Sequence, residues 1–333
     1  MKIIVLVFNK LLKRIILIGC GNIGSRHLQA LVNLHHNIII EIVEPNTKAQ
    51  LLAKSRLKEI KRNKIKHELI WHKSISELKS KGDLVIIATN SENRANLIEK
   101  MLKQGHKRFL VEKIVCQTSE EYKKILLLIK KFNAKGWVNT NRRYFNSYQK
   151  INKYFKNSKY IQMSIFSEGS VLGTQAIHYL DLFCWLAKEK QIKLDGEFLS
   201  KKLLRNKRGK NYVEFSGNIT GSTKSGSCVS LKFSNYGNES YQIKIYDGEK
   251  FININELKDK AYSVNHDGVK YFKFKFEHVS NLTTKIVKDI LTNDDCLLPS
   301  LKNSYEIHKE LFRIFNQHLK RILKTDVKLC PIT

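Results

Sequence analysis

No stretch of the sequence stays apolar for the roughly 18–20 residues that a membrane-spanning helix requires. The apolar segment Met1–Phe8 is short, and no small-residue cleavage site of a signal peptide follows it. We therefore expect no membrane span. We interpret this segment as an extra strand, or as residues that precede the native first strand.

Cysteine is scarce and scattered. The 333 residues include six cysteines, and no two of them form a C-x-x-C pair. This distribution argues against a disulfide framework and against a zinc site. It is typical of reduced thiols, so we expect a cytoplasmic protein that holds no metal.

Acidic residues are few. The chain has 30 of them against 60 lysines and arginines, which gives a formal net charge of +30. Such a charge attracts polyanions. However, the lysines are spread over many segments, such as Lys54–Lys66 and Lys201–Lys210, and no recognised nucleic-acid module accompanies them. We expect no specific nucleic-acid partner, whereas a phosphorylated substrate fits the charge. Strong salt-dependent retention of nucleic acid would contradict this expectation.

A glycine-rich turn follows the first apolar run, Ile15–Ile18, and a predicted helix follows the turn. Between a strand and a helix, the spacing G-x-G-x-x-G is a dinucleotide-binding fingerprint. Gly19 permits the tight turn, Gly21 lets the backbone approach a pyrophosphate, and Gly24 lets the helix pack closely on the strand. The predicted cofactor-binding residues of the turn are Gly19, Gly21, Asn22, Ile23 and Gly24.

An acidic residue ends the second predicted strand. Asn37–Val43 is a nearly continuous apolar run, and Glu44 follows it, about 20 residues past the fingerprint. A carboxylate at this place accepts hydrogen bonds from the adenosine ribose and repels a 2′-phosphate. The sequence therefore predicts NAD as the cofactor and disfavours NADP.

Polar residues follow two further strands, Leu84–Thr89 and Arg108–Val111. Strands that alternate with helices predict a doubly wound parallel sheet, in which all carboxyl ends meet at one edge. We expect that edge to form one ligand cleft with the glycine turn and Glu44. The predicted cofactor residues from these strand ends are Thr89, Asn90 and Glu112.

The pattern changes from about Arg143 onward, where glycine-punctuated alternating runs such as Val213–Thr220 and Cys228–Phe233 predict antiparallel strands. A chain of 333 residues is long enough for two domains. We predict an α/β protein with a Rossmann domain at residues 1–142. Residues 143–333 are expected to form an α+β domain with an open, mainly antiparallel sheet, used for substrate binding and oligomerisation.

Motifs along most of the chain are similar to those of a known family. They are GCGNIGSRH from Gly19, ATN from Ala88, VEK from Val111, NRRY from Asn141 and TQAIHYLDLF from Thr174. On these motifs the chain resembles the glucose-fructose oxidoreductase / inositol dehydrogenase / MocA (Gfo/Idh/MocA) family. The resemblance implies NAD(P) in the first domain and a sugar, cyclitol or nucleotide sugar against the second-domain sheet. It also implies hydride exchange with a secondary alcohol or ketone, and a homo-oligomer.

Lys113 matches the lysine of the family's E-K-P motif, so the resemblance implies a catalytic role. An ammonium group at the sheet edge can polarise a sugar oxygen and help to move its proton, since the pKa of lysine falls readily on burial. The alternative is a surface lysine that follows an exposed strand. Ile114 replaces the proline of the motif, which bears on the peptide geometry after Lys113.

His178 matches the family's active-site histidine and is the second predicted catalytic residue. An imidazole suits removal of the hydroxyl proton because its pKa lies near neutrality. Asp181 lies three residues later on the same helix face, where we expect it to orient or charge-stabilise His178 beside the substrate. The alternative for His178 is a buried histidine that is satisfied inside the helix.

Thr174 stands where many family members carry an aspartate, four residues before the histidine. Threonine cannot act as a carboxylate base, so any proton relay must rest on the lysine and the histidine; we expect Thr174 to contact substrate. Asn90 and Arg94 replace a proline and a histidine of the family. With the tail Cys330–Thr333, these changes are similar to members among bacterial surface-polysaccharide enzymes, which favours a sugar or nucleotide-sugar substrate.

Arg142, Arg143 and Tyr144 are predicted to bind substrate where the two domains meet. Guanidinium groups there could clamp a phosphate or carboxylate through two parallel hydrogen bonds. A salt bridge between the domains is an equally open alternative. Asn139 and Asn141 are likewise open between ligand contact and turn capping.

The sequence thus predicts an NAD-dependent oxidoreductase that acts on a sugar or nucleotide sugar, in bacterial surface-polysaccharide biosynthesis. The alternative is a protein of the same fold that binds a dinucleotide as a sensor or assembly factor, having lost the acid at Thr174. NADH absorbance during a screen of sugars and sugar nucleotides distinguishes the two.

Overall fold

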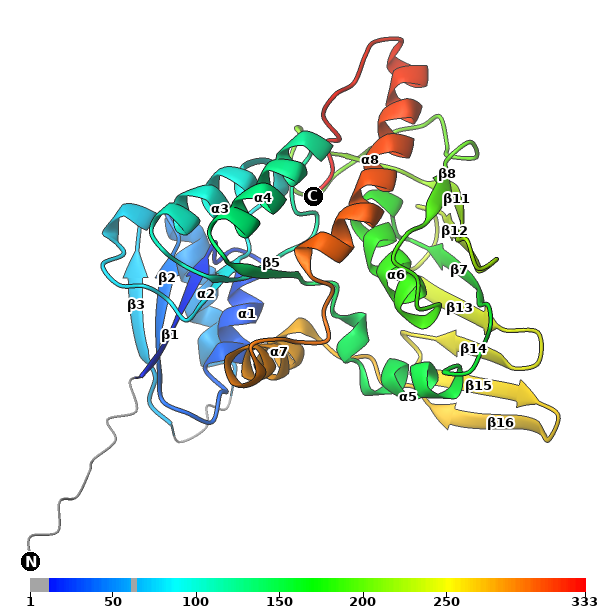
Figure 1. Ribbon diagram of the computed structural model, residues 1–333, viewed down its shortest axis with the longest axis horizontal. Helices are drawn as coiled ribbons and strands as arrows, with labels where there is room; N and C mark the ends of the chain where they lie inside the picture. The colour runs from blue at the N-terminus through cyan, green and yellow to red at the C-terminus, as the bar shows by residue number, and fades with distance from the viewer. Residues whose placement is uncertain (1–11, 61–64) are drawn as a thin grey trace, which may run out of the picture.

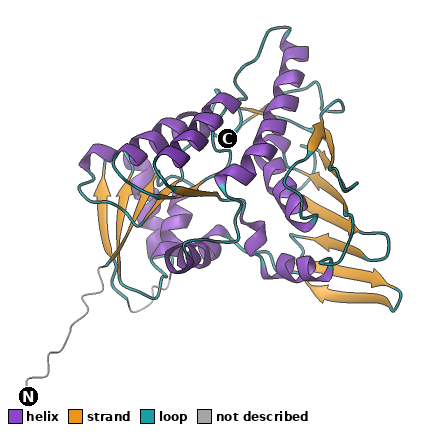
Figure 2. Cartoon of the chain, in the orientation of Figure 1, coloured by secondary structure: helices purple, strands orange, loops and turns teal. Residues whose placement is uncertain are grey.

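The computed structural model describes residues 12–60 and 65–333, so the interpretation of Met1–Phe8 falls outside the described residues. The described chain is built around two sheets that stand apart, with helices between and around them (Figure 1, Figure 2). In these residues no helix is both long enough and apolar enough to cross a membrane.

The N-terminal sheet contains six described strands, all parallel, in the order β3-β2-β1-β4-β5-β6. They are β1 (Lys13–Ile18), β2 (Ile38–Val43), β3 (Glu68–His72), β4 (Leu84–Ile87), β5 (Arg108–Val111) and β6 (Lys135–Val138). The central strands are apolar along their length and fully buried, as expected for a sheet covered on both faces. The order reverses at β1, so the sheet is doubly wound, and the predicted fold class is confirmed.

Helices cover both faces of this sheet. They are α1 (Gly24–Leu31), α2 (Thr47–Lys58), α3 (Arg94–Lys103) and α4 (Ser119–Lys131). Figure 1 shows α3 and α4 on one face and α1 on the other, together with α7 (Val279–Asn293), which returns from far along the chain and packs on α1. The connections between β1 and β3 thus lie opposite those between β4 and β6, which leaves the strand ends open at the reversal point.

The second sheet has eight strands within the described chain, in the order β16-β15-β14-β13-β7-β12-β11-β8, and only the β7–β12 pair is parallel. They are β7 (Gln162–Glu168), β8 (Lys193–Asp195), β11 (Gly217–Ser222), β12 (Cys228–Phe233), β13 (Ser240–Tyr246), β14 (Phe251–Asn255), β15 (Lys260–Asn265) and β16 (Gly268–Lys273). Buried and exposed residues alternate along β7, β12 and β13, because one face is covered and the other is open. This confirms the predicted open, mainly antiparallel sheet.

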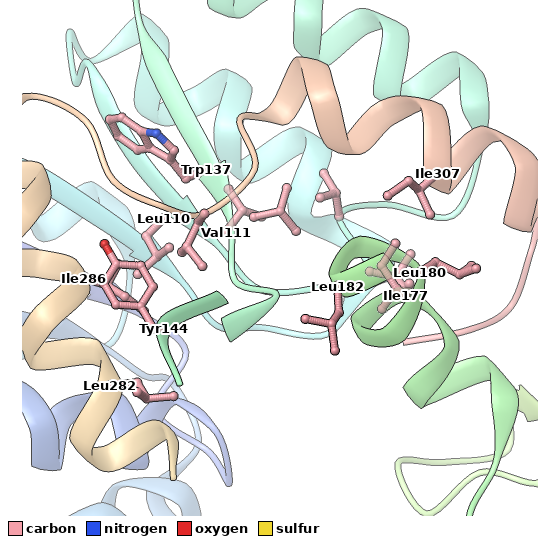
Figure 3. Packing of buried hydrophobic residues seen from close by; sticks show 14 of the residues in the cluster. Leu110, Val111, Trp137, Tyr144, Ile177, Leu180, Leu182, Leu282, Ile286 and Ile307 are labelled. Carbon is pink, nitrogen blue, oxygen red and sulfur yellow. The ribbon is translucent and has the colours of Figure 1, made fainter. Parts of the chain in front are cut away.

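The helices that accompany the second sheet are α5 (Asn146–Tyr154), α6 (Leu172–Leu186) and α8 (Leu301–Leu323). Both α6 and α8 lie between the sheets in Figure 1. Figure 3 shows Leu110 and Val111 of β5 and Ile177 and Leu180 of α6, and all four belong to the same buried hydrophobic cluster. One buried core therefore includes residues of both β5 and α6.

The segment Val213–Thr220, which we predicted as one strand, is divided. Val213–Glu214 forms β10, which pairs with β9 (Leu204–Arg205) in a separate ribbon, whereas β11 starts at Gly217. Gly217 has a φ of +106°, and Phe215 before it stacks on Phe315 of α8. The alternation of the sequence continues through this break, so it does not reveal the change of sheet. We also did not predict β15, whose side chains are mostly polar.

The end of the chain contacts the N-terminal half. Ser91 donates from its backbone N to Thr333 Oγ1 at 3.1 Å and from its hydroxyl to the Ile332 carbonyl at 2.7 Å. Together with α7, this contact joins late parts of the chain to the first sheet. The domain boundary between residues 142 and 143 therefore stays a prediction.

Candidate active site

The glycine turn has the geometry that its spacing predicts. Gly19 adopts a φ of +84°, and a Cβ on Gly24 would lie 1.9 Å from the Gly19 carbonyl oxygen. A Cβ on Gly21 would meet nothing within 4 Å. The backbone at Gly21 is thus open to a close ligand, while the other two glycines shape the turn itself.

The start of α1 faces the same turn. Its N-cap residue is Ile23, whose side chain forms no capping hydrogen bond. The first N–H groups of a helix carry a partial positive charge and attract phosphates. The residues present therefore fit the pyrophosphate of a dinucleotide.

A cleft of about 510 Å³ lies along this edge of the sheet. It brings together nearly all the predicted cofactor residues: Gly19, Gly21, Asn22, Ile23, Glu44, Thr89, Asn90 and Glu112. Gly24 lies behind the turn. A larger hollow of about 1080 Å³ between β8 and α8 is lined by none of the predicted site residues. No cluster of three or more metal-ligand side chains occurs in residues 12–60 and 65–333.

Glu44 is buried at the end of β2, and its carboxylate contacts the turn. Its Oε2 accepts from the Cys20 backbone N at 2.6 Å, and its Oε1 accepts from the Asn46 backbone N at 2.9 Å. The sequence did not single out Arg56 of α2, which donates to the Asn22 carbonyl at 2.7 Å and to Ser25 Oγ at 2.6 Å. Because an arginine near the ribose can accommodate a 2′-phosphate, its engagement with the turn bears on cofactor choice.

We expect NADH to bind more tightly than NADPH, because the Glu44 carboxylate repels a 2′-phosphate and Arg56 is occupied by the turn. Glu44→Gln should narrow the ratio of the two dissociation constants by about tenfold, mainly through tighter NADPH binding. Fluorescence titration of both cofactors measures the ratio. Glu68→Gln, at the exposed start of β3 and outside the cleft, serves as the control. Equal or tighter NADPH binding by the wild type would contradict the NAD preference.

Glu112 is held in a buried network. Its Oε1 accepts from Asn139 Nδ2 at 2.5 Å and lies 2.9 Å from His27 Nε2, while His27 Nδ1 lies 2.8 Å from Thr283 Oγ1 on α7. Burial alone would raise the pKa of Glu112, but the hydrogen bonds from His27 and Asn139 lower it to about 2. Glu112 is therefore a fixed anion that ties the end of β5 to α1 and α7. Asn139 serves this network rather than capping a turn.

Arg94, which the sequence marked only as a departure from the family, joins the ends of two strands. It is fully buried, and its guanidinium donates to the carbonyls of Thr89, Glu112 and Ile114. Arg94 thus holds the backbone on both sides of Lys113. The bond between Lys113 and Ile114 is a cis peptide.

Lys113 lies at the carboxyl end of β5 and is only 6% exposed, so it is not the surface lysine of the alternative reading. Its Nζ donates to the Thr174 carbonyl on α6 at 3.1 Å. Burial, with the positive charge of Arg208 next in importance, lowers its pKa to about 7. Lys113 can therefore both accept and release a proton near neutral pH.

His178 is placed on α6 beside this lysine, and the two interact electrostatically. Its Nδ1 is buried and has no hydrogen-bond partner among the residues that the structure describes. Burial, followed by the charges of Arg142 and Lys113, lowers its pKa well below the ordinary value. Our expectation of a near-neutral pKa is thus wrong. The lowered pKa favours the neutral imidazole, and the residue as a whole is partly exposed.

Asp181 does not orient His178. Its carboxylate accepts from Thr140 Oγ1 at 2.8 Å and from Arg143 Nε and Nη2 at 2.9 and 2.6 Å. Helical spacing predicts that Asp181 and His178 lie on the same face of α6. In the structure, however, the Asp181 carboxylate forms its hydrogen bonds with Arg143 and Thr140. The salt-bridge alternative therefore applies to Arg143.

Arg142 and Tyr144 also form hydrogen bonds with carboxylates of the protein. Arg142 Nε and Nη2 each donate to Glu256 at 3.0 Å, and the guanidinium stacks 4.0 Å from the Tyr179 ring. The Tyr144 hydroxyl donates to Asp289 at 2.6 Å. These residues, in the turn η3 (Asn141–Tyr144), hold α6 and α7 in place, and their polar groups already have protein partners.

Thr174 is paired with a carboxylate that the sequence did not signal. Glu214 of β10 accepts from the Thr174 hydroxyl through a short hydrogen bond, and from the Thr174 backbone N at 3.1 Å. Glu214 is 3% exposed and interacts electrostatically with Lys113. No sequence pattern links β10 to α6, so only the fold reveals this pairing.

Residues 13–140 match the model of the oxidoreductase family with an NAD-binding Rossmann fold, GFO_IDH_MocA. This part of the chain is therefore similar to the NAD-binding domain of that family. The resemblance drawn from the motifs is confirmed there, and GFO_IDH_MocA members bind NAD, as the glycine turn and its cleft predict. No curated protein matches the chain.

Solved structures share the fold over nearly the whole chain at low identity. An oxidoreductase from Agrobacterium radiobacter in complex with NAD⁺, L-tartaric acid and magnesium has a TM-score of 0.72 and 15% identity, covering 90% of this chain and 94% of its own. The UDP-N-acetylglucosamine 3-dehydrogenase GnnA from Acidithiobacillus ferrooxidans has a TM-score of 0.69 and 12% identity, covering 94% and 99%. A mutant of KijD10, a 3-ketoreductase from Actinomadura kijaniata, in complex with TDP-benzene and NADP, has a TM-score of 0.69 and 13% identity, covering 91% and 96%.

Proposed function

We propose that this protein is an NAD-dependent oxidoreductase that interconverts a secondary alcohol and a ketone on a nucleotide sugar. The observation that carries the proposal is the buried Lys113 at the end of β5. It lies next to Glu112 of the dinucleotide cleft and contacts α6, which carries His178. A proton-transfer group and a dinucleotide site at one sheet edge are what alcohol oxidation requires.

The roles of the side chains follow from their charge. Bound NAD supplies a hydride acceptor through its nicotinamide ring, and the reduced cofactor supplies the hydride for the reverse direction. In the oxidising direction, the neutral amine of Lys113 accepts the hydroxyl proton of the substrate. His178, which is neutral and partly exposed, holds the substrate oxygen by a hydrogen bond. In the reducing direction, the Lys113 ammonium returns the proton.

Charge supports a phosphorylated substrate. The net charge of +30 attracts anions, and the cleft rim carries the exposed Arg208, which we did not identify from the sequence. Two proteins of the same fold act on a UDP-sugar or hold a TDP ligand. We extend this substrate class to the present chain, with a place in bacterial surface-polysaccharide biosynthesis in the cytoplasm and assembly as a homo-oligomer.

Arg208→Ala should raise the KM for a nucleotide sugar by about tenfold or more and leave the KM for the free sugar unchanged. The reason is that a guanidinium at the rim binds phosphate through charge-assisted hydrogen bonds. Steady-state kinetics with both substrates measures the difference. Arg205→Ala, an exposed arginine of β9 outside the cleft, is the matched control. Equal effects on both substrates would contradict a phosphate contact.

NADH absorbance during a screen of nucleotide sugars and free sugars, with NAD and with NADH, tests the function. We expect turnover with at least one UDP- or TDP-linked sugar. Tight NAD binding with no turnover across the screen would favour the sensor or assembly protein. The direction that proceeds faster identifies the physiological reaction.

A further inference from the structure

Thr174, in the first turn of α6, lies beside a buried carboxylate that comes from another element. Glu214 reaches Thr174 from β10, which lies in the ribbon beside α6. Its two oxygens accept from the Thr174 hydroxyl and from the Thr174 backbone N. Asn206 Nδ2 donates to the same carboxylate at 2.8 Å, so the group is held from both elements.

The absence of a side chain at Gly173 of α6 leaves room for the Glu214 carboxylate. A Cβ on Gly173 would lie 2.5 Å from Glu214 Oε2, so a side chain at that position would displace it. Thr174 also connects the carboxylate to Lys113, since its carbonyl accepts from Lys113 Nζ at 3.1 Å. One residue of α6 therefore contacts both the buried carboxyl group of Glu214 and the buried amino group of Lys113.

We propose that Glu214 of β10 is a positioning residue, which stabilises the ammonium form of Lys113 during proton transfer. This inference rests on the proposed function, and it assigns to the chain a proton-handling pair on two different elements. In the oxidising direction, the Lys113 amine accepts the proton of the substrate hydroxyl, and bound NAD would accept the hydride. The charge that appears on Lys113 is then balanced by Glu214.

Other charges also face these two groups. Arg94 of α3, Arg208 before β10 and His178 of α6 surround Lys113, together with the adjacent Glu112. Arg94 and Arg208 oppose the ammonium form, whereas the two carboxylates favour it. Glu214 itself faces Lys113, Arg208 and the Cys330 thiol. If the charge of Glu214 is removed, Glu112 is the carboxylate that remains to offset the positive charges of Arg94 and Arg208 around Lys113.

A structural role is the competing explanation, because Glu214 also accepts hydrogen bonds at the N-terminus of α6. Glu214→Gln separates the two roles, since the amide oxygen still accepts from Thr174 but carries no charge. The readout is the titration of Lys113 in the full-length protein, labelled with ¹³C at the lysine side chains and followed by NMR. Lys113→Met identifies its signal.

We expect the Lys113 titration to move about one pH unit lower in Glu214→Gln, because the loss of an adjacent negative charge destabilises the ammonium. Adding Thr174→Asp to this variant should move the titration back up, since it returns a carboxylate to the same turn. Glu277→Gln removes a buried carboxylate that pairs with Lys285 and accepts from the Asn146 N, far from Lys113, and should change nothing.

An unchanged Lys113 titration in Glu214→Gln, or no reversal by Thr174→Asp, would overturn the proposal. If Glu214→Gln does not fold, Gly173→Ala displaces the carboxylate instead and should also lower the titration. The pH profile of kcat/KM with substrate should move in parallel. Because the NMR titration needs no substrate, a failed substrate screen with a shifted titration would reject only the proposed function.

Discussion

Lys113→Met is expected to lower kcat by about 10³-fold, because general acid–base catalysis by one side chain is worth about 10²–10⁴. Methionine fills similar space but neither accepts nor donates the proton. The dissociation constant for NADH should stay within about twofold, since Lys113 contacts α6 rather than the glycine turn. Steady-state kinetics and NADH fluorescence measure the two quantities.

The pH dependence gives the same residue a second test. The Lys113 pKa is lowered to about 7, so the neutral amine needed for oxidation is present above that value. The rate of oxidation should rise as the pH increases through about 7, and the rate of the reverse reaction should fall over the same range. Neither rate should show this pH dependence in Lys113→Met. Lys103→Met, an exposed lysine of α3 paired with Glu99, is the matched control. Wild-type turnover by Lys113→Met would rule out the assignment.

Gly24→Ala should weaken NAD binding by at least about 100-fold and lower the melting temperature. The added methyl group would lie 1.9 Å from the Gly19 carbonyl oxygen, so the turn or the start of α1 must move. Both the close backbone approach and the free N–H groups depend on this geometry. Calorimetry and cofactor titration report the two effects separately.

Gly21→Ala is the informative comparison within the same turn. Its Cβ meets nothing within 4 Å, so the melting temperature should hardly change. The methyl group nevertheless enters the space that a pyrophosphate needs, and we expect about a tenfold weaker NAD affinity. A stable Gly21→Ala variant with wild-type affinity would mean that the dinucleotide does not approach this backbone.

Sequence patterns sufficed where the governing interactions are local. The strand before Gly19 and the helix after Gly24 follow from neighbouring residues, as does the acid at Glu44. Alternating strands and helices then place their carboxyl ends at one edge by the handedness of the crossovers. The cofactor cleft could therefore be derived before any tertiary contact was known.

Side-chain partners could not be derived in this way. Asp181 lies one helical turn from His178 but pairs with Arg143, and the low pKa of His178 arises from burial and from charges on other elements. The sequence also does not reveal that β10 and β11 belong to different sheets, because apolar and polar residues alternate without interruption through both strands. Each outcome depends on which elements the fold packs together, and periodicity carries no information about that.

The sequence by itself determined the dinucleotide turn, the doubly wound sheet and the candidate lysine, because each of them depends on short segments of neighbouring residues. Only the tertiary structure decided what surrounds that lysine. The residues around Thr174 give no sign of a carboxylate partner, whereas the fold brings Glu214 of β10 into hydrogen-bond contact with it. Charge in a buried site acts through space, so the charges near Lys113 depend on the packing of β10 on α6 and not on the order of the chain.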